Sequence, residues 1–197
     1  MRKIGIRISF LLFLCLLAAC SNETKVDNVL TNVELSDREK LLLASASDES
    51  FVFEFRAKDE YKQVSLWVDK YEFGKLTEEH IGRLTTEIEE KDLLILSISK
   101  IPLDEEMLIF NTIVGHGTSF SKVTAKQLSP TENQSIWGSN PLETIPISDQ
   151  MVLATMCYAK GNGMSSLSSE FYMDIDNRIS EMANYDVVYV LKSEFHQ

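Results

Sequence analysis

At positions 51–56 the chain reads FVFEFR, so that three phenylalanines alternate with other residues. Successive side chains of a β-strand point to opposite faces, and this period of two therefore predicts a strand with one apolar face. A second run puts Val64, Leu66 and Val68 on one face, after the polar segment Lys58-Asp59-Glu60. Together the two runs predict a β-hairpin.

The same alternation predicts further strands at 93–99, 107–114, 118–125, 151–159, 167–173 and 186–192. Gly115-His116-Gly117 and Gly161-Asn162-Gly163 each stand between two adjacent runs, and glycine and asparagine suit the tight turns of hairpins. Several short strands with such turns favour a mostly β fold. We expect an antiparallel β-sandwich, immunoglobulin-like or related, with one or two short helices.

The helices are predicted from capping and from helical spacing. Ser36 and Glu39 have the spacing of a capping box, which predicts a helix over 37–45 that docks Leu41 and Leu42. Helical spacing of apolar residues also occurs over 77–91, although Gly82 and two threonines there weaken a helix. A third short helix with an Asp cap is expected over 176–183.

The segment 129–150 differs from this pattern because it holds three of the four prolines in 22 residues. Its apolar residues, which include Ile136 and Trp137, argue against disorder. We therefore expect an ordered flap over one end or one face of the sandwich, with Trp137 as a packing anchor.

The first 20 residues contain Arg2, Lys3 and Arg7, then a short apolar run that ends in Leu17-Ala18-Ala19-Cys20. This order resembles a bacterial lipoprotein signal peptide, in which a leucine and two small residues precede the lipidated cysteine. The resemblance implies cleavage before Cys20, a diacylglycerol with palmitate-type acyl chains on its thiol, and anchoring outside the cytoplasmic membrane. It does not say whether the cell has one membrane or an outer membrane as well.

On this interpretation residues 1–19 are the signal peptide, 20–35 a lipidated flexible tether and 36–197 a single domain. Loss of the three basic residues of the signal peptide takes the net charge from −11 to −14. Such acidity argues against nucleic acid and anionic lipid surfaces as partners, since both bind basic patches. The membrane contact is then supplied by the lipid on Cys20.

Three cysteines occur, and the third, Cys157, has no partner once Cys15 is removed and Cys20 is lipidated. We expect Cys157 to be a small buried hydrophobe on a strand rather than a reactive thiol. A hydrophobic core without disulfides must then stabilise the domain.

No catalytic, cofactor or metal site is predicted. His80 lies near Glu87 and Glu90, but this spacing matches no strong metal motif and is more typical of a solvated acidic face. Serines are plentiful, yet His116 lies in a turn and His196 beside the C-terminus, which disfavours a buried catalytic triad.

The aromatic residues are the better candidates for a binding surface. Trp67, Tyr71 and Phe73 share the face opposite Val64, and Trp137 lies in a turn-rich loop. An exposed aromatic row would stack on sugars or on a partner's apolar surface, whereas a doubly covered strand would bury the same rings as core. The packing alternative is favoured for each group.

These observations favour a non-catalytic binding or interaction module that acts on a cell-envelope protein or polysaccharide. Two alternatives stay open: a cell-envelope hydrolase that uses a carboxylate pair, and a scaffold or regulatory subunit without a small ligand.

Overall fold

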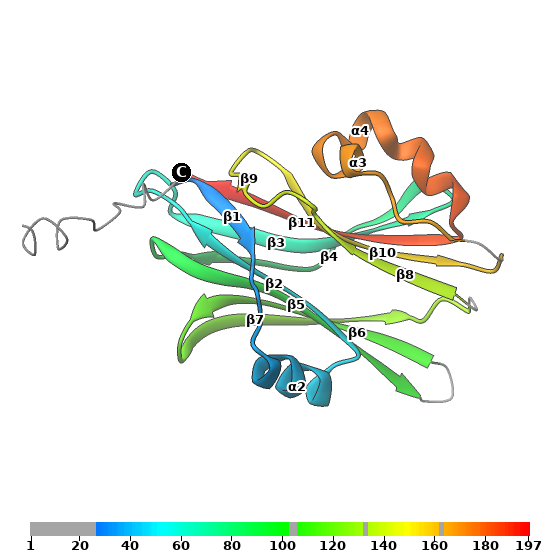
Figure 1. Ribbon diagram of the computed structural model, residues 1–197, viewed down its shortest axis with the longest axis horizontal. Helices are drawn as coiled ribbons and strands as arrows, with labels where there is room; N and C mark the ends of the chain where they lie inside the picture. Colours follow the sequence, from blue (N-terminus) through cyan, green and yellow to red (C-terminus); the bar gives the residue numbers. More distant parts are fainter. Residues whose placement is uncertain (1–26, 103–105, 132–133, 162–163) are drawn as a thin grey trace, which may run out of the picture.

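Two antiparallel sheets packed face to face form the domain in this computed structural model, which describes residues 27–102, 106–131, 134–161 and 164–197 (Figure 1). The first sheet has the order β7-β6-β5-β2-β1-β9 and the second the order β4-β3-β11-β10-β8. The expected antiparallel β-sandwich is thereby confirmed.

The strands of the first sheet are β1 (Val29–Asn32), β2 (Glu49–Arg56), β5 (Lys91–Pro102), β6 (Glu106–His116), β7 (Ser119–Leu128) and β9 (Ile145–Pro146). Those of the second are β3 (Gln63–Glu72), β4 (Lys75–Glu87), β8 (Gln134–Ser139), β10 (Met151–Ala159) and β11 (Val187–His196). The helical elements are α2 (Asp37–Ala46), α3 (Ser169–Met173), α4 (Ile175–Arg178) and the 3-10 helix η1 (Ile179–Asn184).

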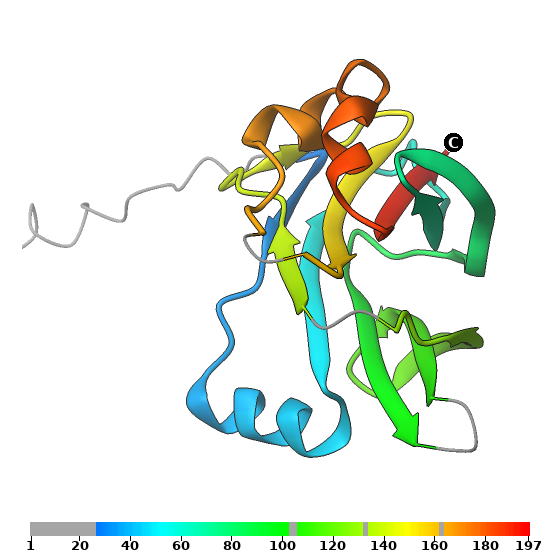
Figure 2. The ribbon, with the colours of Figure 1, turned by 90° about the vertical axis from the view of Figure 1, so that its right-hand side faces the viewer.

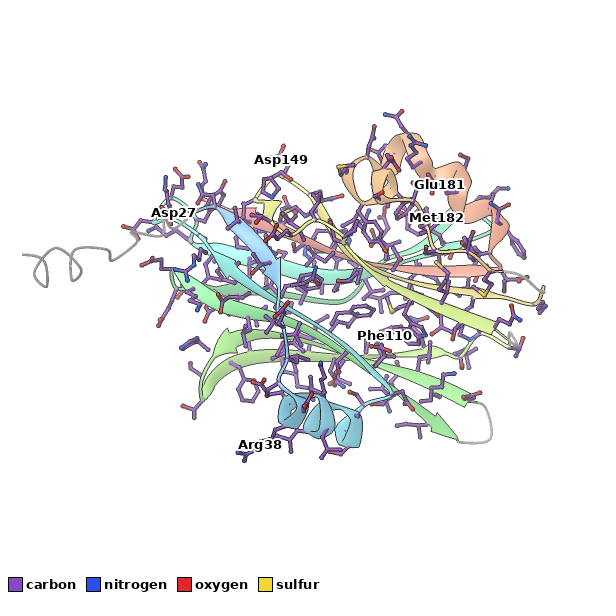
Figure 3. All side chains as sticks on the ribbon, in the orientation of Figure 1. Asp27, Arg38, Phe110, Asp149, Glu181 and Met182 are labelled. Carbon is purple, nitrogen blue, oxygen red and sulfur yellow. The ribbon has the colours of Figure 1, made fainter. Side chains whose placement is uncertain are left out.

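The main core lies between the sheets and is built by the alternation that the sequence displays. Phe51, Phe53 and Phe55 of β2 point inward, and Val64 and Leu66 of β3 face them from the other sheet. Figure 3 shows Phe110 between the two layers, where it is fully buried. Burial of such side chains contributes on the order of 2 kcal/mol each.

One side of the sandwich is closed by β4 lying against β6 and β7, through hydrogen bonds of side chains rather than a backbone ladder. The Thr112 hydroxyl donates to the carbonyl of Gly82 at 2.6 Å, and the Gln127 side-chain amide donates to Glu78 at 3.0 Å. Gly82 has φ +60°, and a Cβ there would lie 3.3 Å from that of Ala125. Glycine thus serves both the bulged backbone of β4 and the close approach of β7.

A second, smaller core covers part of the outer face of the second sheet. Figure 2 shows α3, α4 and η1 above this sheet, and Met182, labelled in Figure 3, is fully buried beneath them. Phe171 and Tyr185 pack with it against Val188 and Val190 of β11. Asp174 caps α4 by accepting the N–H of Asn177, so the predicted Asp-capped helix near 176 is confirmed.

Two segments fold differently from their sequence patterns. Residues 77–91, expected as a helix, lie mostly in strand β4, to which Gly82 and the threonines are better suited. Residues 167–173, expected as a strand after a glycine hairpin, instead contain helix α3, capped by the Ser168 hydroxyl. Serine competes well for backbone N–H groups at a helix start, and this local bond outweighs the alternation.

The predicted hairpin of FVFEFR with Val64–Val68 is also wrong, because β2 and β3 belong to different sheets. Both strands turn an apolar face inward, so they pack across the core instead of side by side. The turn at Gly115-His116-Gly117 does join a hairpin, β6–β7, as predicted. The second predicted turn lies partly outside the described residues.

Helix α2 begins at the predicted capping box, in which Ser36 and Glu39 satisfy each other's N–H groups. The expected docking of Leu41 and Leu42 is wrong, since these side chains are 73% and 58% exposed. Figure 2 shows α2 standing off the end of the first sheet, and Arg38 points away from it in Figure 3. Leu43 is half-buried and lines a pocket together with Glu49 and Ser50 of β2.

The expected tether is partly folded, and the expected ordered flap is placed differently from the prediction. Residues 29–32, assigned to the tether, form β1 between β2 and β9. Within 129–150, β8 joins the edge of the second sheet and β9 joins the first. The segment thus links the two sheets rather than lying over them as a flap.

Cys157 is buried in the second core, and burial raises the pKa of its thiol to about 12, although a hydrogen bond with Thr155 lowers it slightly. The expectation of a small buried cysteine on a strand is confirmed.

Candidate functional site

The four aromatic candidates do not form one surface. Trp67 is fully buried and Tyr71 packs in the second core, so the packing alternative is confirmed for these two. Phe73 is 62% exposed, in the turn that Phe73 and Gly74 make between β3 and β4 with positive φ. Trp67 lies under the side chains of β4, with the Arg83 guanidinium 5.2 Å from its ring centroid.

Trp137 is half-buried on β8, where it closes one edge of the main core. Its ring centroid lies 6.4 Å from that of Phe51 and 6.2 Å from that of Tyr158, and its Nε1 donates to the Ser135 hydroxyl at 3.2 Å. The contact with Phe51 joins the two sheets, and the contacts with Tyr158 and Ser135 lie within the second sheet, which makes Trp137 a packing residue.

We expect Trp137→Ala to lower the free energy of unfolding by about 2 kcal/mol, somewhat below the loss for a fully buried aromatic. Trp137→Phe keeps most of the contact and is expected to lose less than half of that, and Phe73→Ala, at an exposed ring, almost nothing. Denaturant unfolding of the three variants measures the difference. An unchanged midpoint for Trp137→Ala would contradict the packing role and favour a ligand contact.

A buried charge cluster, unforeseen from the sequence, lies on the outer face of the second sheet beside Trp67. The Lys192 ammonium contacts Asp69 at 3.1 Å and the Tyr71 hydroxyl at 3.4 Å, and the second Asp69 oxygen accepts the N–H of His80 at 2.9 Å. His80 has φ +60°, a strained conformation that this bond stabilises. Asp69 and Lys192 are both buried, so neither is offered to a ligand.

Burial lowers the pKa of Lys192, but the nearby Tyr71 and Asp69 outweigh it and the pKa is raised overall. Burial also raises the pKa of Tyr71, and Lys192 offsets only part of that. The ammonium and the neutral phenol are therefore the stable forms at neutral pH, and the cluster is structural rather than a proton donor or nucleophile.

A serine, a histidine and a carboxylate also meet on this face, although the sequence disfavoured such a group. The Ser65 hydroxyl lies 2.9 Å from His196 Nε2, and His196 Nδ1 lies 3.8 Å from Glu194. The alternation of Glu194 and His196 along the last strand is the sequence signal for it. The Ser65 side chain is fully buried, and 3.8 Å is too long for a hydrogen bond, so this group is not arranged for nucleophilic attack.

An open pocket of about 360 Å³ lies where β4 ends, β5 begins and the β6–β7 hairpin turns. We call it the end pocket. It is lined by Thr86, Glu87, Ile88, Glu89, Asp92, Val114, His116, Ser119, Phe120 and Ser121. A pocket of this volume suits a small ligand or one substituent of a larger ligand.

The end pocket arises because the inward-facing positions of several strands change from apolar to polar at this end. On β5, Leu94 and Leu96 point into the core and Asp92 is next in that row. On β6, His116 follows inward-facing Val114, and on β7 Ser121 precedes Val123. Polar residues at positions that would otherwise extend a core reduce stability, so their presence points to a function.

Local contacts hold the end pocket open. The hydroxyls of Thr86 and Ser121 are 3.0 Å apart and join β4 to β7, and Asp92 accepts the N–H of Glu89 at 3.2 Å. A Cβ on Gly115 would lie 2.5 Å from the Cα of Phe120, so glycine permits the approach of β7. The sequence marked Gly115 only as a turn residue and did not reveal the pocket.

The end pocket lies at the end of the domain where the described chain begins. Val29 pairs with Arg56, and Arg56 pairs with Lys91 beside Asp92. Figure 1 shows the C-terminus and the start of β1 at this same end. Any ligand in the end pocket is therefore at the end of the domain where β1 begins.

Within the described part of the chain, no three His, Cys, Asp or Glu side chains converge as metal ligands, and no helix has the length and apolarity to span a bilayer. His80, Glu87 and Glu90 are all exposed.

The protein is therefore a two-sheet β-sandwich domain with a polar pocket at one end. The family model described as the YgaN domain matches residues 29–195, and the chain therefore belongs to the YgaN domain family. No curated protein and no solved structure gave a significant match.

Proposed function

We propose that this protein is a lipid-anchored extracytoplasmic binding module without catalytic activity of its own, and that its ligand enters the end pocket. The observation that carries the proposal is the polar lining, in which buried Asp92 lies in the inward row of β5 and exposed His116 and Ser119 lie at the paired ends of β6 and β7. By contrast, the Ser65 hydroxyl and the Lys192 ammonium are buried away from any substrate.

The proposed anchor is Cys20, at the lipobox Leu17-Ala18-Ala19-Cys20. The proposed partner is a cell-envelope protein or polysaccharide, because these are the macromolecules that an anchored domain meets outside the membrane. The net charge of −11 disfavours nucleic acid. The end pocket lies at the end of the domain where β1 begins, and this position supports a ligand close to the membrane surface.

The test is cosedimentation of the purified, detergent-solubilised protein with isolated peptidoglycan that keeps its attached polymers. We expect binding that Ser119→Trp abolishes, since the indole fills the end pocket. Thr124→Trp is the matched control, because Thr124 is exposed and lies on the opposite face of the same strand. This variant is expected to bind as the unmodified protein does.

Equal binding by Ser119→Trp would place the ligand elsewhere. Absence of binding by the unmodified protein would favour the scaffold alternative, and release of soluble saccharide fragments would favour the hydrolase alternative.

A further inference from the structure

The charges around the end pocket are unbalanced. Three of its ten lining residues are carboxylates, Glu87, Glu89 and Asp92, and none is lysine or arginine. Lys91, the neighbour of Asp92 in the chain, pairs with Glu54 at 2.8 Å instead. The lining therefore has negative charge without a positive partner of its own.

Asp92 is the most informative of the three because its side chain is inside the domain. It is only 5% exposed, and its one hydrogen bond within the described residues comes from the N–H of Glu89. A carboxylate that is largely removed from water is stabilised by a cationic partner. The inward row of β5 directs this group toward the end pocket rather than toward solvent.

The remaining lining specifies the kind of cation. Ile88 and Val114 supply apolar surface that is continuous with the main core, and hydroxyls of Ser119 and Ser121 lie beside it. This combination suits an ammonium group on a short alkyl chain, with the chain on the apolar surface and the ammonium at the carboxylates. Calcium would need six to eight oxygen ligands, whereas the described residues bring no three metal-binding side chains together.

We propose that the end pocket binds a primary ammonium group carried on a short alkyl chain. This inference rests on the proposed function, whose ligand site it shares, and adds the chemical class of the ligand. The carboxylates attract the ammonium group through charge, so the affinity of the end pocket for this group falls as the salt concentration rises.

The experiment compares three probes of equal length by isothermal titration calorimetry on the purified, detergent-solubilised protein: 1,5-diaminopentane, neutral 1,5-pentanediol and the dianion glutarate. We expect only the diamine to bind, with a Kd that rises when salt is increased from 50 to 500 mM. The variant Glu87→Gln/Glu89→Gln, altered at two exposed rim positions, is expected to weaken diamine binding about threefold to tenfold.

Glu106→Gln/Glu143→Gln removes two exposed carboxylates outside the end pocket and is the charge-matched control, with unchanged diamine affinity expected. If both double variants weakened diamine binding equally, the effect would be one of net charge alone, and this would overturn the inference. Binding of the diol or of glutarate as tightly as the diamine would also overturn it, as would no diamine binding. The proposed function is separable, because peptidoglycan binding that Ser119→Trp abolishes would stand in each of these cases.

Discussion

Replacement of Asp69 by alanine is expected to lower the free energy of unfolding by about 3–5 kcal/mol, which corresponds to a fall in Tm of about 10 °C. The reason is that Lys192 would remain buried without its counter-ion, 3.1 Å away in the native cluster. The N–H of His80, held at positive φ, would also lose its acceptor. Thermal and denaturant unfolding followed by circular dichroism measure the change.

The matched control is Glu72→Ala on the same strand, which breaks the more exposed ion pair of Lys70 with Glu72 and should cost less than about 1 kcal/mol. Asp69→Asn keeps an acceptor for the N–H of His80. Its loss of unfolding free energy is therefore expected to lie between those of Asp69→Ala and Glu72→Ala. Replacing Asp69 and Lys192 together by leucine should recover most of the loss, because no unpaired charge is then buried. A loss below about 1 kcal/mol for Asp69→Ala would show that the pair does not stabilise the sheet.

The same cluster predicts the direction of a pH dependence. The pKa values of Lys192 and Tyr71 are both raised on folding, so the native state holds more protons than the unfolded chain at alkaline pH. Their contribution to stability is therefore complete below about pH 10 and is lost as pH rises through the folded-state pKa values. We expect this alkaline loss to be smaller in the double leucine variant.

Cys20→Ala is expected to transfer the protein from the membrane fraction to the soluble fraction. The proposed diacylglycerol contributes about 0.8 kcal/mol for each buried methylene, and two chains suffice for stable anchoring. On the lipobox interpretation the processed chain has a net charge of −14, which does not attract it to anionic lipids in place of the anchor. Fractionation with detection of the domain, and mass spectrometry of the species found, measure the result.

Cys157→Ala is the matched control, since it removes the buried cysteine and should leave the protein in the membrane pellet. If Cys20→Ala protein were cut at the same position, unlipidated and still in the pellet, the lipobox interpretation would be wrong. Retention with an uncleaved signal segment is distinguished by mass and would show that processing itself needs Cys20.

The architecture followed from the sequence where alternation was regular. The inward phenylalanines of 51–56 lie in the core as expected, and so do Leu94 and Leu96 of the run 93–99. The sequence did not predict which strands pair, because an apolar face indicates that a strand is buried but not to which sheet the strand belongs. Capping residues predicted the starts of α2 and α4 correctly, since these bonds are local.

The candidate site was the least predictable part. The sequence pattern put Trp67, Tyr71 and Phe73 on one strand face, but Phe73 lies in the turn after β3, and β4 and the helices near the C-terminus cover only the first two. The end pocket gathers residues from 86–92 with others from 114–121, and their polarity gains meaning only when the register puts Asp92 and His116 in inward rows. That register depends on contacts distant in the chain.

The start of β1 at Val29 limits how far the domain can move from the proposed anchor. Because the fold begins at Val29, the proposed anchor at Cys20 leaves only nine residue steps, a reach of at most about 30 Å. The end pocket, at the same end, would sweep a hemisphere of that radius, in which a single membrane-bound ligand has an effective concentration on the order of 10 mM. A pocket of millimolar affinity would then be occupied most of the time beside the membrane and empty away from it.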